Sequence, residues 1–82
     1  NIDYSYSVDY AVKYDRNREV ICFVSDDMEA LKNVNVSLYT VGARLLYSFT
    51  ADKEQPLTEL PSGTYIVHWV YEGKSHSAKL KK

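Results

Sequence analysis

The chain has 82 residues, a length that allows one small domain and excludes two. Its ten Lys and Arg residues are balanced by eleven Asp and Glu residues, for a formal net charge of −1, which excludes the dense basic surface of a nucleic-acid-binding protein. The single cysteine, Cys22, excludes an intrachain disulfide and a cysteine-based metal cage, and no apolar run is long enough to span a membrane.

Residues 4–14 are the first segment with a clear periodicity, and tyrosine is its most frequent residue. Apolar and aromatic side chains alternate there with small or polar ones, at Tyr4, Tyr6, Val8, Tyr10, Val12 and Tyr14. This period of two predicts a β-strand with one buried face. Each buried tyrosine hydroxyl needs a hydrogen-bond partner, so four tyrosines in one stripe exceed what a small core easily satisfies. We therefore expect some of them at a sheet edge or in contact with a partner.

A polar reversal at residues 15–18 leads to a second predicted strand at residues 19–24. This strand is apolar on both faces, which indicates a central place in its sheet. Cys22 lies within it, and we expect it to behave as a small buried hydrophobic residue and not as a nucleophile.

The polar residues 25–33 predict a solvated loop with at most one helical turn, capped by Ser25 or Asp26. The acids of this loop lack the alternating ligands and the glycine of a calcium-binding loop. The next segments predict, in order, a strand at residues 34–39, a turn at Gly42, a strand at residues 45–50, a charged loop at residues 51–55 and a short strand at residues 56–59.

The last third of the chain carries the strongest local pattern. A proline and a glycine within residues 60–63 predict a corner. Residues 64–71 are β-branched or aromatic at nearly every position, which is typical of a strand. Glu72 and Gly73 predict a two-residue hairpin turn, and residues 74–80 predict the return strand.

A two-residue turn also predicts the register of this hairpin. Its apolar face carries four pairs, which are Tyr71 with Lys74, Trp69 with His76, Val67 with Ala78 and Tyr65 with Leu80. His68 lies on the opposite, more polar face, so a metal site or an acid–base pair shared with His76 is disfavoured. Two interpretations of Tyr65 stand: a tyrosine corner, in which the hydroxyl bonds back to upstream backbone, or a plain core tyrosine.

About seven short strands with turn signals between them predict an all-β fold, an immunoglobulin-like or fibronectin-III-like Greek-key sandwich, as one domain over residues 1–82. The sequence contains no nucleophile motif and no phosphate-binding glycine loop. We therefore expect no catalytic residue, no metal and no cofactor, and a protein that is not an enzyme.

A binding surface is expected at Tyr4, Tyr6, Tyr10 and Tyr71, since exposed tyrosines stack on sugar rings and are enriched at protein interfaces. The alternative is that these tyrosines only fill the core and pair strands. The basic residues Lys79, Lys81 and Lys82 are expected to form a frayed, solvated end. An unpaired edge strand could also pair two copies of the chain.

Three stretches resemble secreted proteins of Bacteroidetes. Residues 36–46 resemble their strand, turn glycine and strand. Residues 60–67, Leu-Pro-Ser-Gly-Thr-Tyr-Ile-Val, resemble their element of leucine, two residues, glycine, one residue and tyrosine. Residues 72–75 and 79–82 resemble their final hairpin and basic end. The similar groups are the small Bacteroides-type secreted immunoglobulin-like domains of unknown function and the C-terminal sorting domains of type IX secretion.

The resemblance implies a secreted, periplasmic or cell-surface location. It fits a stand-alone module better than a sorting tail, because one domain takes up nearly the whole chain and Gly and Asn are few. The leading hypothesis is thus a non-enzymatic module that binds an unknown protein or glycan or takes part in assembly. The alternatives are a C-terminal sorting or anchoring domain and a glycan-binding module.

Overall fold

The computed structural model describes residues 10–82, which form seven strands and one 3₁₀ turn. The elements are β1 (Tyr10–Asp15), β2 (Val20–Ser25), η1 (Met28–Leu31), β3 (Asn35–Thr40), β4 (Leu45–Thr50), β5 (Gln55–Pro56), β6 (Thr64–Tyr71) and β7 (Lys74–Lys81). One sheet has the order β1-β2-β5 and the other has the order β4-β3-β6-β7, and all neighbouring strands are antiparallel.

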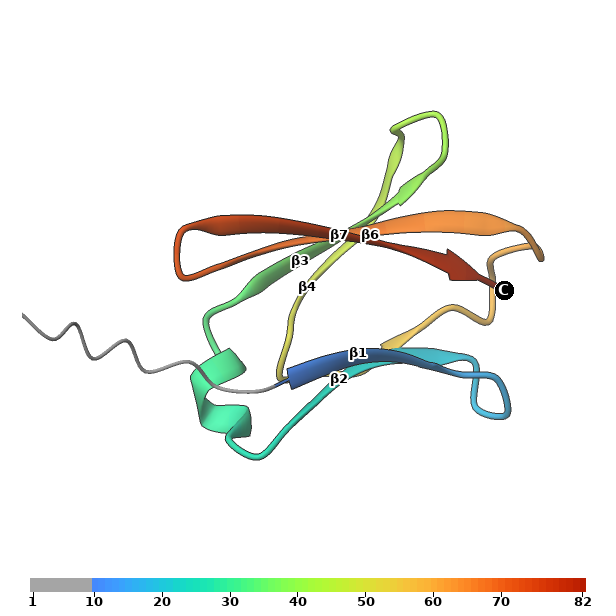
Figure 1. Cartoon of the computed structure of the whole chain (residues 1–82). Coiled ribbons are helices and arrows are strands. Elements are labelled where there is room, and N and C mark those ends of the chain that lie inside the picture. The colour runs from blue at the N-terminus through green and yellow to red at the C-terminus, as the bar shows by residue number, and fades with distance from the viewer. Residues whose placement is uncertain (1–9) are drawn as a thin grey trace, which may run out of the picture.

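The two sheets pack face to face as a sandwich (Figure 1). The chain crosses between them three times, from β2 to β3, from β4 back to β5, which pairs with β2, and from β5 to β6. This arrangement confirms the predicted immunoglobulin-like or fibronectin-III-like Greek-key sandwich of about seven strands. β2 is the central strand of its sheet, also as predicted.

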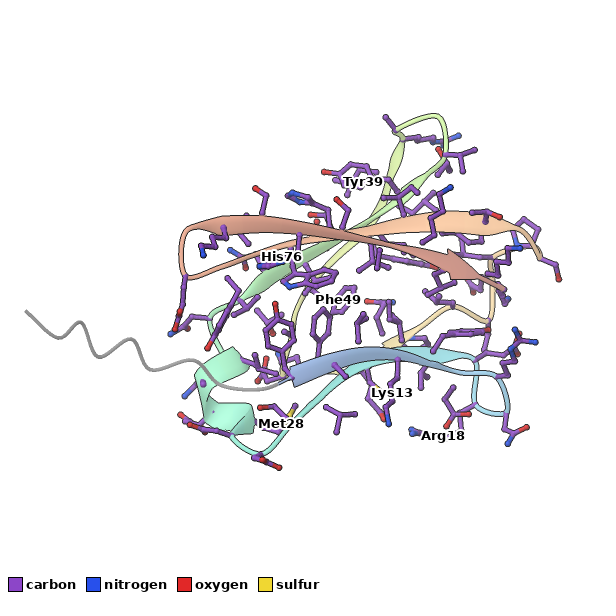
Figure 2. The ribbon with its side chains drawn as sticks, in the orientation of Figure 1. Lys13, Arg18, Met28, Tyr39, Phe49 and His76 are labelled. Atoms are coloured by element: carbon purple, nitrogen blue, oxygen red, sulfur yellow. The ribbon has the colours of Figure 1, made fainter. Side chains whose placement is uncertain are left out.

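The core lies between the sheets, and Figure 2 shows Phe49 there. Alternation along each strand points every second side chain inward, so both sheets contribute to one apolar layer. The largest fully buried side chains are Ile21, Leu31, Val36, Leu38, Leu57 and Val67. Trp69, the single tryptophan, is 6% exposed in the same layer.

The β6–β7 hairpin has the predicted register at all four inner-face pairs. Glu72 and Gly73 both have positive φ, 51° and 76°, as a two-residue primed turn requires. The Tyr65 hydroxyl donates a hydrogen bond to the carbonyl oxygen of Pro61, while the Tyr65 ring is buried. Of the two interpretations of Tyr65, the tyrosine corner is therefore the one observed.

Two local predictions are wrong in detail. The helical turn is capped by Asp27 and not by Ser25 or Asp26, because the Asp27 carboxylate accepts a hydrogen bond from the Ala30 N–H. The short strand is Gln55–Pro56 and ends before residue 57, where the chain turns inward and buries Leu57 completely. By contrast, the turn predicted at Gly42 is confirmed, and the residue with positive φ beside it is Ala43, at 69°.

The prediction of a frayed basic end is wrong for Lys82. Its backbone N–H and C=O exchange two hydrogen bonds with Gly63, of 2.8 and 2.9 Å. Its side chain is 9% exposed, and its ammonium group donates to the carbonyl oxygens of Leu57 and Leu60 and lies 3.1 Å from a carboxylate oxygen of Glu19. Three acceptors from distant parts of the chain therefore hold this lysine, while Lys79 and Lys81 are exposed.

Cys22 is half-buried, and not buried as predicted, because it faces outward from the three-stranded sheet. Its neighbour on that face of β2, Val24, is 46% exposed, so the apolar outer face of β2 is not fully covered. The partial burial still raises the pKa of the Cys22 thiol, which disfavours the reactive thiolate.

Candidate functional site

The edge strands β1 and β7 border an open groove along one side of the sandwich, called here the β1–β7 groove. In Figure 1, β7 is drawn in front of β6 and β1 in front of β2, so the view is onto this side. The groove has a volume of about 400 Å³ and is lined from both strands and from the core beneath them. Each of the two strands has a neighbouring strand on one side only in the part of the chain that the structure describes.

The floor and walls of the groove are apolar. The side chains that form them are Val12, Tyr14, Ile21, Val67, Ala78 and Leu80. Ile21 and Val67 belong to the core, whereas Val12, Tyr14 and Ala78 are half-buried at its margin. The small Ala78 side chain on β7 leaves space opposite β1, so inner-face apolar surface is open to solvent along this side.

Four basic residues are among those that line the groove, namely Lys13, Arg16, Lys79 and Lys81, and the strand alternation places the side chains of Lys13, Lys79 and Lys81 on the outer faces of the two sheets, beside the groove. No acidic residue is among the lining residues. The ion pairs within residues 10–82 join Arg18 to Glu54, Lys32 to Glu29 and Lys82 to Glu19, so none of them neutralises these four cations. In a chain with a net charge of −1, basic side chains thus flank the groove on the β7 side and on the β1 side.

An aromatic cluster lies beside the turn at which β6 and β7 meet. The Tyr10 ring centroid is 5.1 Å from that of Tyr71, 6.2 Å from that of Trp69 and 6.1 Å from that of Phe23. The Trp69 indole N–H donates a 2.8 Å hydrogen bond to the Tyr10 hydroxyl, and His76 stacks on the indole with its centroid 5.5 Å away. Figure 2 shows His76 on the side of its sheet that faces β1 and β2.

The structure therefore brings two of the four predicted surface tyrosines together. Tyr10 and Tyr71 are both half-buried, and the Tyr10 ring is in contact with aromatic rings on several sides. Tyr4 and Tyr6 lie outside the described residues. Because its hydroxyl and its ring both have partners within the domain, Tyr10 contributes to the packing of this end of the sandwich.

A second hollow, of about 350 Å³, lies on the outer face of the four-stranded sheet. Tyr39 projects there, on the side away from β1 and β2 (Figure 2). The other lining residues are Thr40, Val41, Ala43, Ile66, His68 and Ser77. We call it the Tyr39 hollow. Our sequence reasoning missed it, although the outward place of Tyr39 in the alternation of residues 34–39 was the available signal.

The groups that could carry chemistry do not converge. His68 and His76 lie on opposite faces of the hairpin, as predicted. Within residues 10–82, no three His, Cys, Asp or Glu side chains come together as a metal site. Arg18 and Glu54 form a two-bonded ion pair of 2.6 and 2.7 Å, whose hydrogen bonds lower the pKa of Glu54, but both side chains are exposed.

A comparison of the chain with protein-family models finds no match, and a comparison with curated proteins finds none either. In residues 10–82, no helix has the length and the apolar character needed to cross a membrane.

Proposed function

We propose that this chain is a non-enzymatic binding or assembly module, and that the β1–β7 groove is its binding surface. The observation that carries the proposal is the groove itself, where apolar inner-face side chains lie open between two strand edges. Strand edges beside apolar pockets are a recurrent way to bind extended polypeptides, because backbone hydrogen bonds supply affinity and the pockets supply specificity. The resemblance to Bacteroides-type secreted domains supports a secreted or envelope-associated location.

Filling the groove tests this function. A library of displayed random peptides is selected against the native domain, and each selected peptide is then measured against Ala78→Phe. The added ring occupies the groove, so we expect affinity to fall by at least about tenfold, as for loss of a central interface contact. The measurement is a titration by isothermal calorimetry.

Val70→Phe is the matched control, because it adds a similar ring at a 46% exposed position on the outer face of β6. It should bind the selected peptides like the native domain. Equal affinity of Ala78→Phe and Val70→Phe for every selected peptide would show that the groove is not the binding surface.

Glycan binding is a second candidate function, and the Tyr39 hollow favours it. The tyrosine ring offers a stacking face, while His68 and Ser77 add polar groups that could bond sugar hydroxyls. We expect Tyr39→Ala to lower the affinity for a bound polysaccharide by about 1–2 kcal/mol, and Tyr39→Phe to retain most of it. Calorimetry with polysaccharides that bind the native domain measures this, and unaltered binding by Tyr39→Ala would exclude the hollow.

A further inference from the structure

We infer that the β1–β7 groove receives an extended polypeptide from another protein, a strand in which acidic and apolar side chains alternate and which pairs with the edge of β7 that has no neighbouring strand within residues 10–82. The inference rests on the proposed binding function and names the class of partner. It follows from three features: the backbone hydrogen-bonding groups of β7 that point away from β6, the two faces that an added strand would have, and the charged side chains beside the groove.

The alternation of hydrogen-bonded and non-bonded pairs between β6 and β7 shows which backbone groups of β7 point away from β6. A two-residue turn makes Tyr71 and Lys74 a hydrogen-bonded pair, and such pairs alternate with non-bonded ones along an antiparallel ladder. At the other end of the two strands, the two backbone hydrogen bonds between Gly63 and Lys82 fit the same alternation of bonded and non-bonded pairs. The N–H and C=O groups that point away from β6 therefore belong to Ser75, Ser77, Lys79 and Lys81.

A strand added at this edge would present its side chains alternately to the two faces of the sheet. Side chains on the inner face would enter the groove over Ala78 and Val12, where apolar groups are favoured. Side chains on the outer face would lie beside Lys79 and Lys81, at the distance of cross-strand neighbours. An alternation of apolar and acidic residues satisfies both faces.

The outer-face lysines of β7 argue for an acidic partner and against a second copy of this chain. Pairing β7 with β7 would bring lysines of the two copies together, and lysines on an edge strand oppose such pairing. The edge strand β4 contains no acidic residue. In β1 the acid is Asp15, whose carboxylate already accepts hydrogen bonds from the N–H groups of Asn17 and Arg18.

Three synthetic peptides test the inference with the intact domain. The first alternates Val and Glu over the eight-residue length of β7, the second has Lys in place of Glu, and the third has the residues of the first in a non-alternating order. We expect the first to bind at least about tenfold more tightly than the other two, and its affinity to fall as salt is added. The double variant Lys79→Glu/Lys81→Glu should prefer the Lys peptide instead.

Amide hydrogen exchange shows whether the peptide pairs as a strand. In the free domain, the amides of His76, Ala78 and Leu80 should exchange slowly because they bond to β6, and those of Ser75, Ser77 and Lys79 should exchange fast. Binding of the acidic peptide should slow the second set. Adsorption to the lysines alone would leave that alternation unchanged.

The peptide-binding and hydrogen-exchange results each support or contradict the inference. Equal binding of the acidic and Lys peptides, or binding without protection of Ser75, Ser77 and Lys79, would overturn the inference. Groove-dependent library peptides without acidic residues would overturn it too, while leaving the proposed binding function in place. Fluorescence of Trp69 and thermal unfolding establish that the charge-reversal variant is folded.

Discussion

Deleting residues 79–82 is expected to unfold the domain, and not to remove a loose tail. Leu80 is 7% exposed in the core, and losing a buried leucine side chain costs about 2–5 kcal/mol. Lys82 is lost as well, and each hydrogen bond from a charged donor contributes about 1.5–3 kcal/mol. Together these losses approach the whole free energy of unfolding of a small domain, about 5–15 kcal/mol.

Urea unfolding measures this effect through the fluorescence of Trp69, the only tryptophan. The matched control is Lys79→Gln/Lys81→Gln, which changes two exposed side chains and should alter the free energy of unfolding by less than about 1 kcal/mol. The single variant Lys82→Met isolates the contribution of the buried ammonium group. A truncated chain with the urea midpoint of the full chain would contradict the expectation.

This result bears on the sorting hypothesis. If secretion machinery reads the basic end, deletion of residues 79–82 cannot test it, because an unfolded domain could be retained for that reason alone. The exposed pair Lys79→Gln/Lys81→Gln is the suitable variant, since it changes the charge while Leu80 and Lys82 stay in place. Unchanged export of this variant would exclude recognition of those two charges.

Tyr10→Ala is expected to lower the free energy of unfolding by about 2–4 kcal/mol, as for other losses of large aromatic side chains from a packed region. The change removes ring contacts with Phe23, Trp69 and Tyr71 and leaves the Trp69 indole N–H without its acceptor. Tyr10→Phe retains the ring and loses only the hydroxyl, so it should lower the free energy of unfolding by about 1 kcal/mol.

Urea unfolding quantifies the effect of both substitutions, and the emission maximum of Trp69 reports whether the indole becomes more exposed to solvent. Tyr39→Ala is the control, because that tyrosine lies on the outer face and is not in the core cluster. Tyr39→Ala should lower the free energy of unfolding clearly less than Tyr10→Ala does. If Tyr10→Ala destabilised the domain no more than Tyr39→Ala does, the aromatic cluster would not stabilise this end of the sandwich.

The Tyr10 result also decides how ligand experiments should be designed. A loss of binding in Tyr10→Ala would be ambiguous, since the change disturbs the packing beside the groove. Ala78→Phe and Tyr39→Ala act on the two candidate surfaces without removing a member of the aromatic cluster.

The hairpin of β6 and β7 could be predicted residue by residue because its determinants are local. Two residues that accept positive φ specify the turn, and the alternation on either side specifies which face is buried. The strand alternation elsewhere was sufficient for the fold class for the same reason. The predicted strand limits were wrong where the burial of a single side chain changed the direction of the chain, as at the fully buried Leu57.

The sequence by itself thus determined the approximate positions of most strands, the register of the last hairpin and the sandwich class, since steric preferences and alternation act over a few residues. Only the tertiary structure decided that β1 and β7 lie on the same side, so that Lys13 and Arg16 line one groove with Lys79 and Lys81. It also decided that the Lys82 ammonium group meets Glu19, Leu57 and Leu60. Those contacts join residues far apart in the chain, and they form only when strand order and packing bring the segments together.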